Sequence, residues 1–283
     1  MLVRVDQLTK EAAAAGYGIA APCPLDFECI KWCFETASTL KAPFIICYHA
    51  WKNDGMSAEE LADGVKYYAA RYPEVPMGLC LDHGRSYEDA ARAIQAGFTA
   101  VMVDRSDLSD EENAAAILEA VKLAHAANVS VEAALGGAQT RDASLEQREG
   151  TLTNAPSARK FALATGVDAI AVAVGSYHGD VKDQEAIMHY DLIQELKATV
   201  PVSLVMHGCS FLGEEKLRKS AQLGISKFNV QGELLNAGMQ AAKGRLLEQG
   251  GCVSTAELNR VIRDAYVAQL TDFMTAIGNA GRL

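Results

Sequence analysis

The chain has 283 residues and a formal net charge of −10 at pH 7, from 26 basic and 36 acidic side chains. An acidic protein repels phosphate backbones, so nucleic acid is excluded as an expected partner. No apolar run approaches the roughly 20 residues of a membrane span, which argues against a membrane partner. Because 49% of the residues are hydrophobic, we expect an ordered globular protein with a sizeable core.

The seven cysteines are an odd number and include no CxxC pair, which argues against a disulfide framework. Several of them lie in apolar stretches, as buried thiols do. The first 18 residues carry charges among the apolar ones and predict an amphipathic helix rather than a signal peptide. We therefore expect a reduced, cytoplasmic protein.

Apolar runs typical of strands alternate with helical segments along the whole chain. The predicted strands cover residues 17–21, 43–48, 77–81, 99–103, 129–134, 168–174, 202–206 and 227–230. Helices are expected at about 26–40, 57–71 and 87–95, and again after residues 109, 157 and 254. Three helix starts carry the Ser-x-x-Glu pattern of an N-terminal cap, at Ser57, Ser109 and Ser254.

This alternation predicts a parallel sheet with helices between its strands. Eight such units, in a chain near the usual barrel length of about 250 residues, favour a closed (β/α)₈ TIM barrel. We expect one domain over residues 1–283, with a doubly wound open sheet as the alternative fold. The longest irregular stretch, residues 136–153, is polar and contains glycine, as lids and binding loops often do.

Polar side chains follow the predicted strands at their carboxyl ends, which in a barrel lie on the face that carries active sites. Three of the six histidines stand at such ends, each followed by glycine: His83, His178 and His207. Three converging imidazoles predict a zinc-type site with an open coordination position. The other polar residues at these ends are Asp82, Asp104, Glu132, Ser210, Asn229 and His49, the last a candidate pocket residue.

Several segments together resemble the class II, metal-dependent ketose-bisphosphate aldolase family, which includes fructose- and tagatose-bisphosphate aldolases. They are LDHGRSYEDAARAIQAGFTAVMVDRS, VSVEAALGG, GVDAIAVAVGSYHG, MHGCS and LGISKFNV, in order, over about residues 16–237. The resemblance implies a TIM-barrel aldolase that binds Zn²⁺, with a monovalent cation as a further candidate. It also implies a small-molecule sugar substrate and a homodimer or homotetramer.

The matching motifs imply that His83, His178 and His207 are zinc ligands and that Asp82 is the catalytic acid/base. A Lewis acid chelated by a ketone and its neighbouring hydroxyl stabilises an enediolate. A carboxylic acid beside it can exchange a proton with the C4 oxygen as the C3–C4 bond breaks or forms. By the same matching, the site of the dihydroxyacetone moiety would be lined by Gly179, Gly208, Ser210 and Asn229, and Asp104 and Glu132 are candidates for a second metal or the pocket.

The chain departs from the family pattern around the sugar and phosphate sites. Turn glycines aim backbone N–H groups at phosphate oxygens, so their loss argues against ordinary binding of a 1-phosphate. Arg105 and Arg141 are candidates to replace the missing charge, or else solvated loop charges. The departures are Cys23 after the first strand, Cys47 and His49 in the second, Ala134 in the fifth, Cys209 and Phe211 in the turn after His207, and Gln231, Gly232 and Leu235 after the eighth.

Two further expectations concern single residues. We expect Cys209 to be accessible from the pocket, the alternative being an inert packed thiol. In the loop over residues 136–153, Asp142, Glu146 and Glu149 are candidates for the base that takes the C3 proton of the donor, or else solvated charges. The favoured function is reversible aldol cleavage, and the alternatives are a non-catalytic aldolase-like subunit and a metal-dependent sugar epimerase or isomerase.

Overall fold

The computed structural model describes residues 1–49, 55–136, 150–178 and 186–283. Five residues singled out in the sequence lie outside the described residues: Arg141, Asp142, Glu146, Glu149 and Gly179. Among the described residues, no helix combines the length and the apolar character that crossing a membrane requires.

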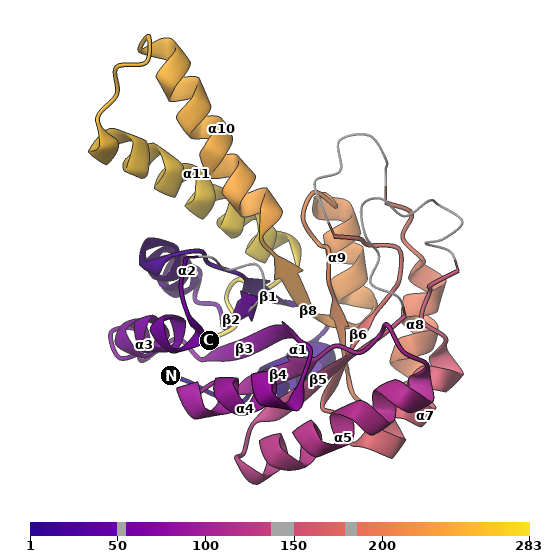
Figure 1. Cartoon of the computed structure of the whole chain (residues 1–283). Coiled ribbons are helices and arrows are strands. Elements are labelled where there is room, and N and C mark those ends of the chain that lie inside the picture. Colours follow the sequence, from indigo (N-terminus) through magenta and orange to yellow (C-terminus); the bar gives the residue numbers. More distant parts are fainter. Residues whose placement is uncertain (50–54, 137–149, 179–185) are drawn as a thin grey trace.

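The described residues form a parallel eight-stranded sheet that curls into a TIM barrel (Figure 1). Hydrogen-bonded neighbours follow the order β1-β8-β7-β6-β5-β4-β3-β2. The two end strands, β1 and β2, lie against each other, so the barrel is nearly closed. The strands are β1 (Ile19–Pro22), β2 (Phe44–His49), β3 (Met77–Gly84), β4 (Ala100–Val103), β5 (Ser130–Leu135), β6 (Ala169–Val172), β7 (Ser203–Met206) and β8 (Ile225–Val230).

Helices surround the barrel, and the three expected serine caps are confirmed. Ser57 and Ser109 form complete capping boxes with Glu60 and Glu112, and the Ser254 side chain accepts a hydrogen bond from a backbone N–H of the first turn. The helices are α1 (Val5–Ala15), α2 (Phe27–Leu40), α3 (Ala58–Ala69), α4 (Tyr87–Ala96), α5 (Asp110–Ala126), α7 (Ala155–Thr165), α8 (Tyr190–Thr199), α9 (Glu214–Leu223), α10 (Gly232–Glu248) and α11 (Thr255–Ala276).

Helix α1 closes the end of the barrel at which the strands begin. The backbone N–H of Val3 donates to the carbonyl of Met77, the first residue of β3. A Cβ built on Gly78 would lie 2.4 Å from a methyl group of Val5, so this glycine allows the helix to approach the strand. Apolar side chains of α1 pack with inward-facing residues of β1 and β2 in one buried cluster. Because this end is plugged, the carboxyl ends of the strands are the open face of the barrel.

The last two helices, α10 and α11, extend beyond the barrel as an antiparallel pair (Figure 1). Helix α10 begins directly after β8, which carries Asn229, and α11 follows α10. The chain thus leaves the open face of the barrel through α10 and returns along α11 to end at Leu283.

Strand β3 runs three residues further than the predicted strand, which ended at Leu81. Its pairing with β4 is regular at Leu81 and resumes only at Gly84, with a register shift between them. Asp82 and His83 therefore lie within a bulge of the strand rather than after it. A bulge re-aims side chains at the rim of a barrel, and this one places both residues at the open face.

Candidate active site

The backbone of His83 adopts a left-handed conformation with φ of 53°. For a residue other than glycine this conformation costs of order 1–2 kcal/mol, and such strain concentrates at functional sites. The next residue, Gly84, has no room for a side chain, since a Cβ there would lie 2.8 Å from the carbonyl oxygen of Met102. The tight packing of β3 on β4 thus holds the His83 ring in place.

Three imidazoles from three strands converge at the open face. Ligand nitrogens of His83, His178 and His207 all lie within 4.8 Å of one another. His83 comes from the bulge of β3, His178 from the segment after β6 and His207 from the residue directly after β7. The ring centroids are 4.7 to 5.7 Å apart. The three histidines singled out in the sequence are therefore brought together.

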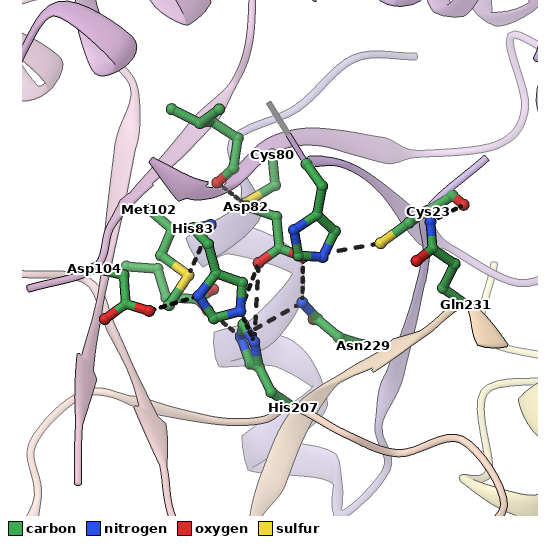
Figure 2. Close-up of polar contacts among 12 residues, drawn as sticks. Cys23, Cys80, Asp82, His83, Met102, Asp104, His207, Asn229 and Gln231 are labelled. Carbon is green, nitrogen blue, oxygen red and sulfur yellow. Dashed lines mark hydrogen bonds and ion pairs between the residues drawn. The ribbon is translucent and has the colours of Figure 1, made fainter. Parts of the chain in front are cut away.

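Two of these rings are each oriented by a carboxylate (Figure 2). The Nδ1 of His83 lies 2.6 Å from Oδ2 of Asp104, and the Nε2 of His207 lies 2.9 Å from Oε1 of Glu132. Both carboxylates accept, so these ring nitrogens carry hydrogens. The opposite nitrogens, Nε2 of His83 and Nδ1 of His207, then present lone pairs to each other at 3.0 Å. Carboxylate-oriented imidazoles with facing lone pairs fit a bound metal cation.

The carboxylate of Asp104 is itself held by Ser106, whose hydroxyl and backbone N–H donate to Oδ1 at 2.7 and 3.1 Å. Burial raises the pKa of Asp104, but the hydrogen bonds from His83 and Ser106 outweigh burial and leave the pKa below its usual range. Asp104 therefore stays ionised and can keep its hydrogen bond to His83.

One oxygen of the Asp82 carboxylate collects three donors (Figure 2). Its Oδ2 lies 2.8 Å from Nε2 of His49, 3.0 Å from Nδ2 of Asn229 and 3.8 Å from Sγ of Cys23. The side chain is completely buried. Burial raises the pKa of Asp82, while the imidazoles of His49, His83 and His207 lower it, and the net pKa lies well below the usual value.

The other oxygen of Asp82, Oδ1, faces the histidine cluster. It is buried and has no hydrogen-bond partner among the described residues. It lies 3.7 Å from Nε2 of His83 and 3.8 Å from Nδ1 of His207. Buried carboxylate oxygens normally have partners, so this orphaned oxygen also fits a cation or a substrate hydroxyl between it and the rings.

A cavity of about 140 Å³ opens beside this carboxylate. The glycine at its rim is required by the backbone: Gly208 has a φ of +64°, and a Cβ there would lie 2.4 Å from the carbonyl of Tyr177. The cavity is lined by most of the sequence-predicted pocket residues, namely Asp82, His49, His178, Gly208, Ser210 and Asn229, together with Cys23, Tyr177, Val230, Gln231 and Gly232.

One prediction about this face is wrong. Cys209 is not accessible from the pocket: its side chain is completely buried in the core and its Sγ donates to the carbonyl oxygen of Met206. Asp104 and Glu132, the candidates for a second metal or the pocket, lie beside the histidine cluster. Each hydrogen-bonds an imidazole of the cluster, Asp104 that of His83 and Glu132 that of His207. Asp104 does line a pocket, one that it shares with the three histidines.

Arg105, a candidate for replacing the phosphate-site charge, lines neither of the two cavities described here. Its Nε pairs with Oδ1 of Asp107 at 3.3 Å, and the Asp107 side chain is 68% exposed. The Arg105 side chain itself is 32% exposed, and its part in binding a phosphate stays a prediction. The other candidate, Arg141, and the predicted pocket residue Gly179 lie outside the described residues.

Sequence reasoning missed one residue of the site and named another only as a departure from the family pattern. Lys227 of β8 is completely buried and pairs with Glu132 at 2.7 Å. Cys23 lies at the cavity and contacts Asp82. A lysine within a buried strand, two residues from Asn229, is a signal that could have found the first, because residues i and i+2 share one face of a strand.

Comparison with known proteins places the chain among aldolases. The family model described as "Fructose-bisphosphate aldolase class-II" matches residues 3–282. The crystal structure of the YdjI aldolase from Escherichia coli K12 superposes with a TM-score of 0.88 at 28% identity, covering 100% of this chain and 99% of that one.

Two other solved structures are similar over nearly their whole length. A candidate fructose-1,6-bisphosphate aldolase from Coccidioides immitis has a TM-score of 0.84 at 26% identity, covering 99% of this chain and 97% of its own. The fructose-bisphosphate aldolase from Campylobacter jejuni has a TM-score of 0.83 at 18% identity, covering 100% and 97%, and this likeness concerns the fold.

Proposed function

This chain belongs to the class II fructose-bisphosphate aldolase family, and we propose that it uses zinc to cleave a ketose phosphate, or a related modified ketose, reversibly. The products would be a dihydroxyacetone or dihydroxyacetone phosphate unit and an aldehyde. As a member of this family the chain is a metal-dependent aldolase, a lyase. The observation that carries the zinc assignment is the convergence of three imidazole nitrogens within 4.8 Å of one another beside the buried Asp82.

In this proposal His83, His178 and His207 hold the ion and leave a coordination position open to the cavity. Three neutral imidazoles with an open position are a donor set that Zn²⁺ favours in catalytic sites. Asp104 and Glu132 fix the ring orientations through their hydrogen bonds to His83 and His207. When bound, the ion would supply Lewis acidity toward the ketone and its neighbouring hydroxyl, which stabilises an enediolate.

Asp82 is proposed to move the proton at the C4 oxygen. In cleavage its carboxylate takes the proton of the C4 hydroxyl as the C3–C4 bond breaks, and in condensation the acid returns that proton to the aldehyde oxygen. The reacting oxygen would be Oδ1, since Oδ2 is already engaged by Cys23, His49 and Asn229. These contacts keep the carboxylate from rotating away from the substrate.

The cavity residues Gly208, Ser210 and Asn229 are proposed to bind the donor half of the sugar. The hydroxyl of Ser210 and the amide of Asn229 supply hydrogen bonds to donor hydroxyls. In the turn after His207, the backbone N–H of Phe211 already donates to Oε2 of Glu233 at 3.1 Å. This N–H is therefore not available to the donor half of the sugar. The family also leads us to propose a homodimer or homotetramer, which sedimentation velocity would test.

Solvent deuterium exchange, followed by NMR, tests the proposal without knowledge of the aldehyde. The zinc-loaded protein should exchange a carbon-bound hydrogen of dihydroxyacetone phosphate or of dihydroxyacetone, and the more active of the two identifies the donor. His207→Ala should lose this exchange together with the metal. Exchange of neither compound by zinc-loaded protein would contradict the proposal.

Asp82→Asn separates the two halves of the reaction. Because Asp82 is assigned to the C4 oxygen, this variant should keep the exchange reaction and lose cleavage by about 10² to 10⁴-fold, the usual contribution of a positioned acid or base. Equal loss of both reactions would contradict that role. If the product of a candidate ketose is an epimer rather than two fragments, the protein is an epimerase that uses the same enediolate.

A further inference from the structure

A second group of ligand atoms lies beside the histidine cluster. The Sγ of Cys23, a ring nitrogen of His49 and a carboxylate oxygen of Asp82 all lie within 4.8 Å of one another. The three side chains are buried, with exposed fractions of 4%, 8% and 0%. They come from neighbouring strands: Cys23 follows β1, His49 ends β2 and Asp82 lies in β3. All three line the cavity described above, and Cys23 and Asp82 are labelled in Figure 2.

The distances lie on either side of those in a tetrahedral metal site. Zinc–ligand bonds of about 2.0–2.3 Å place neighbouring donor atoms about 3.3–3.7 Å apart. Here Nε2 of His49 is 2.8 Å and Sγ of Cys23 is 3.8 Å from Oδ2 of Asp82. Small side-chain rotations would bring these atoms to ligand spacing.

We propose that Cys23, His49 and Asp82 form a second cation site, which takes a thiophilic divalent ion such as Zn²⁺ or Cd²⁺. Sulfur, imidazole and carboxylate donors together select such ions over Mg²⁺ or Ca²⁺. Binding would release the thiol proton of Cys23 to solvent and keep the remaining proton of His49 on Nδ1. The thiolate and the carboxylate then offset the charge of the ion, so the buried site as a whole stays neutral.

An ion at this site would switch the enzyme off, a consequence that rests on the proposed function. Asp82 cannot both bind a cation through its carboxylate and exchange a proton with the C4 oxygen of the substrate. The ion would also occupy the cavity beside Ser210 and Asn229. We expect about a hundredfold loss of cleavage when the second site fills, in line with the contribution of a general acid or base.

Cobalt titration of the metal-free protein isolates this site. The three-histidine cluster contains no sulfur, so a thiolate-to-cobalt charge-transfer absorption reports on a cysteine ligand alone. Wild-type protein should develop this absorption by two equivalents of Co²⁺, and Cys23→Ser should not. The serine keeps a donor to Asp82, and its melting temperature should confirm that the fold is retained.

Cys252→Ser is the matched control, because it removes an exposed thiol far along the chain and should leave the absorption unchanged. His207→Ala should lose the histidine site but keep the absorption. The proposal is overturned if wild-type protein shows no thiolate absorption at two equivalents, or if the absorption persists in Cys23→Ser.

An activity arm addresses the inhibition separately. Excess Zn²⁺ should inhibit cleavage by wild-type protein at concentrations that also fill the sulfur-containing site. Cys23→Ser should need at least about tenfold more Zn²⁺, because loss of a ligand should cost no less than loss of a partner that only orients a ligand, which costs about 10–100-fold. Identical inhibition curves would overturn the inhibitory role. If the protein proves to lack aldolase activity, the cobalt absorption still decides whether the site exists.

Discussion

The Nζ of Lys227 lies 2.7 Å from Oε2 of Glu132 inside the barrel, where the two side chains are 0% and 3% exposed. The other oxygen of Glu132 lies 2.9 Å from Nε2 of His207. Burial raises the pKa of Glu132, but the charge of Lys227 and the hydrogen bond from His207 lower it below the usual value. The ion pair therefore keeps a charged acceptor in place beneath one imidazole of the cluster.

Breaking this pair should destabilise the fold strongly. Lys227→Met leaves the Glu132 carboxylate buried without its cation, and removing one partner of a buried pair costs about 3–5 kcal/mol. Lys122→Met is the matched control, since Lys122 and Glu119 lie 2.6 Å apart but are 71% and 69% exposed, and such pairs contribute less than about 1 kcal/mol. Urea denaturation measures the free energy of unfolding of both variants. Equal losses of stability would show that burial does not determine how much an ion pair contributes.

The hydrogen bond from His83 to Asp104 should govern metal affinity. Asp104→Asn replaces a charged acceptor of the Nδ1 hydrogen by an amide, and loss of such a partner weakens metal binding about 10–100-fold. The dissociation constant for Zn²⁺, from competition with a chromophoric chelator, checks this. Asp107→Asn is the control, because Asp107 is 68% exposed and contacts Arg105. Unchanged affinity in Asp104→Asn would mean that the ring needs no orienting carboxylate.

Much of the architecture was predictable because strands and helices alternate and their boundaries are marked in the sequence. The buried apolar runs are short and the serine caps mark where helices begin, which is local information. The three histidines were predictable for the same reason, since each stands at a strand end and all strand ends of a parallel barrel share one face. The convergence of His83, His178 and His207 follows from that geometry.

Other features depend on contacts that no local pattern encodes. The left-handed backbone of His83 arises from a register shift between β3 and β4, which a strand pattern does not reveal. Cys209 follows a strand end like the pocket residues, yet its side chain turns into the core toward Met206. The approach of Cys23 to Asp82 joins residues 59 positions apart, and chain distance carries no sign of it.

The turn after His207 should tolerate no side chain at Gly208. This residue has a φ of +64°, and a Cβ would lie 2.4 Å from the carbonyl of Tyr177. Gly208→Ala should therefore combine the cost of a left-handed conformation with that of overpacking, together about 2 kcal/mol or more. Gly213→Ala separates the two costs, because Gly213 has a φ of +82° and nothing within 4 Å of its Cβ position. Thermal denaturation measures both variants. Equal losses in melting temperature would show that the clash with Tyr177 contributes nothing.

Asp6 of α1, at the base of the barrel, should make a pH-dependent contribution to the free energy of unfolding. Its carboxylate lies 2.8 Å from Nε of Arg4 and 2.8 Å from Nζ of Lys10, and its side chain is 8% exposed. Burial raises the pKa of Asp6, but the hydrogen bonds from Arg4 and Lys10 outweigh burial and lower it below the usual value. The folded state therefore binds this proton less readily than the unfolded state, and the ionised group stabilises the fold.

This stabilisation is present above the unfolded pKa, near 4, and is lost as the pH falls through the lower folded pKa. Asp6→Asn should lower the free energy of unfolding by about 1 kcal/mol at pH 7, and the difference from wild type should shrink below pH ~4. Asp63→Asn is the control: Asp63 is 77% exposed and lies 3.5 Å from Lys66, so it should change stability little at either pH. Urea denaturation at both pH values measures the effect, and an Asp6→Asn deficit that persists undiminished in acid would mean that Asp6 contributes through its shape rather than its charge.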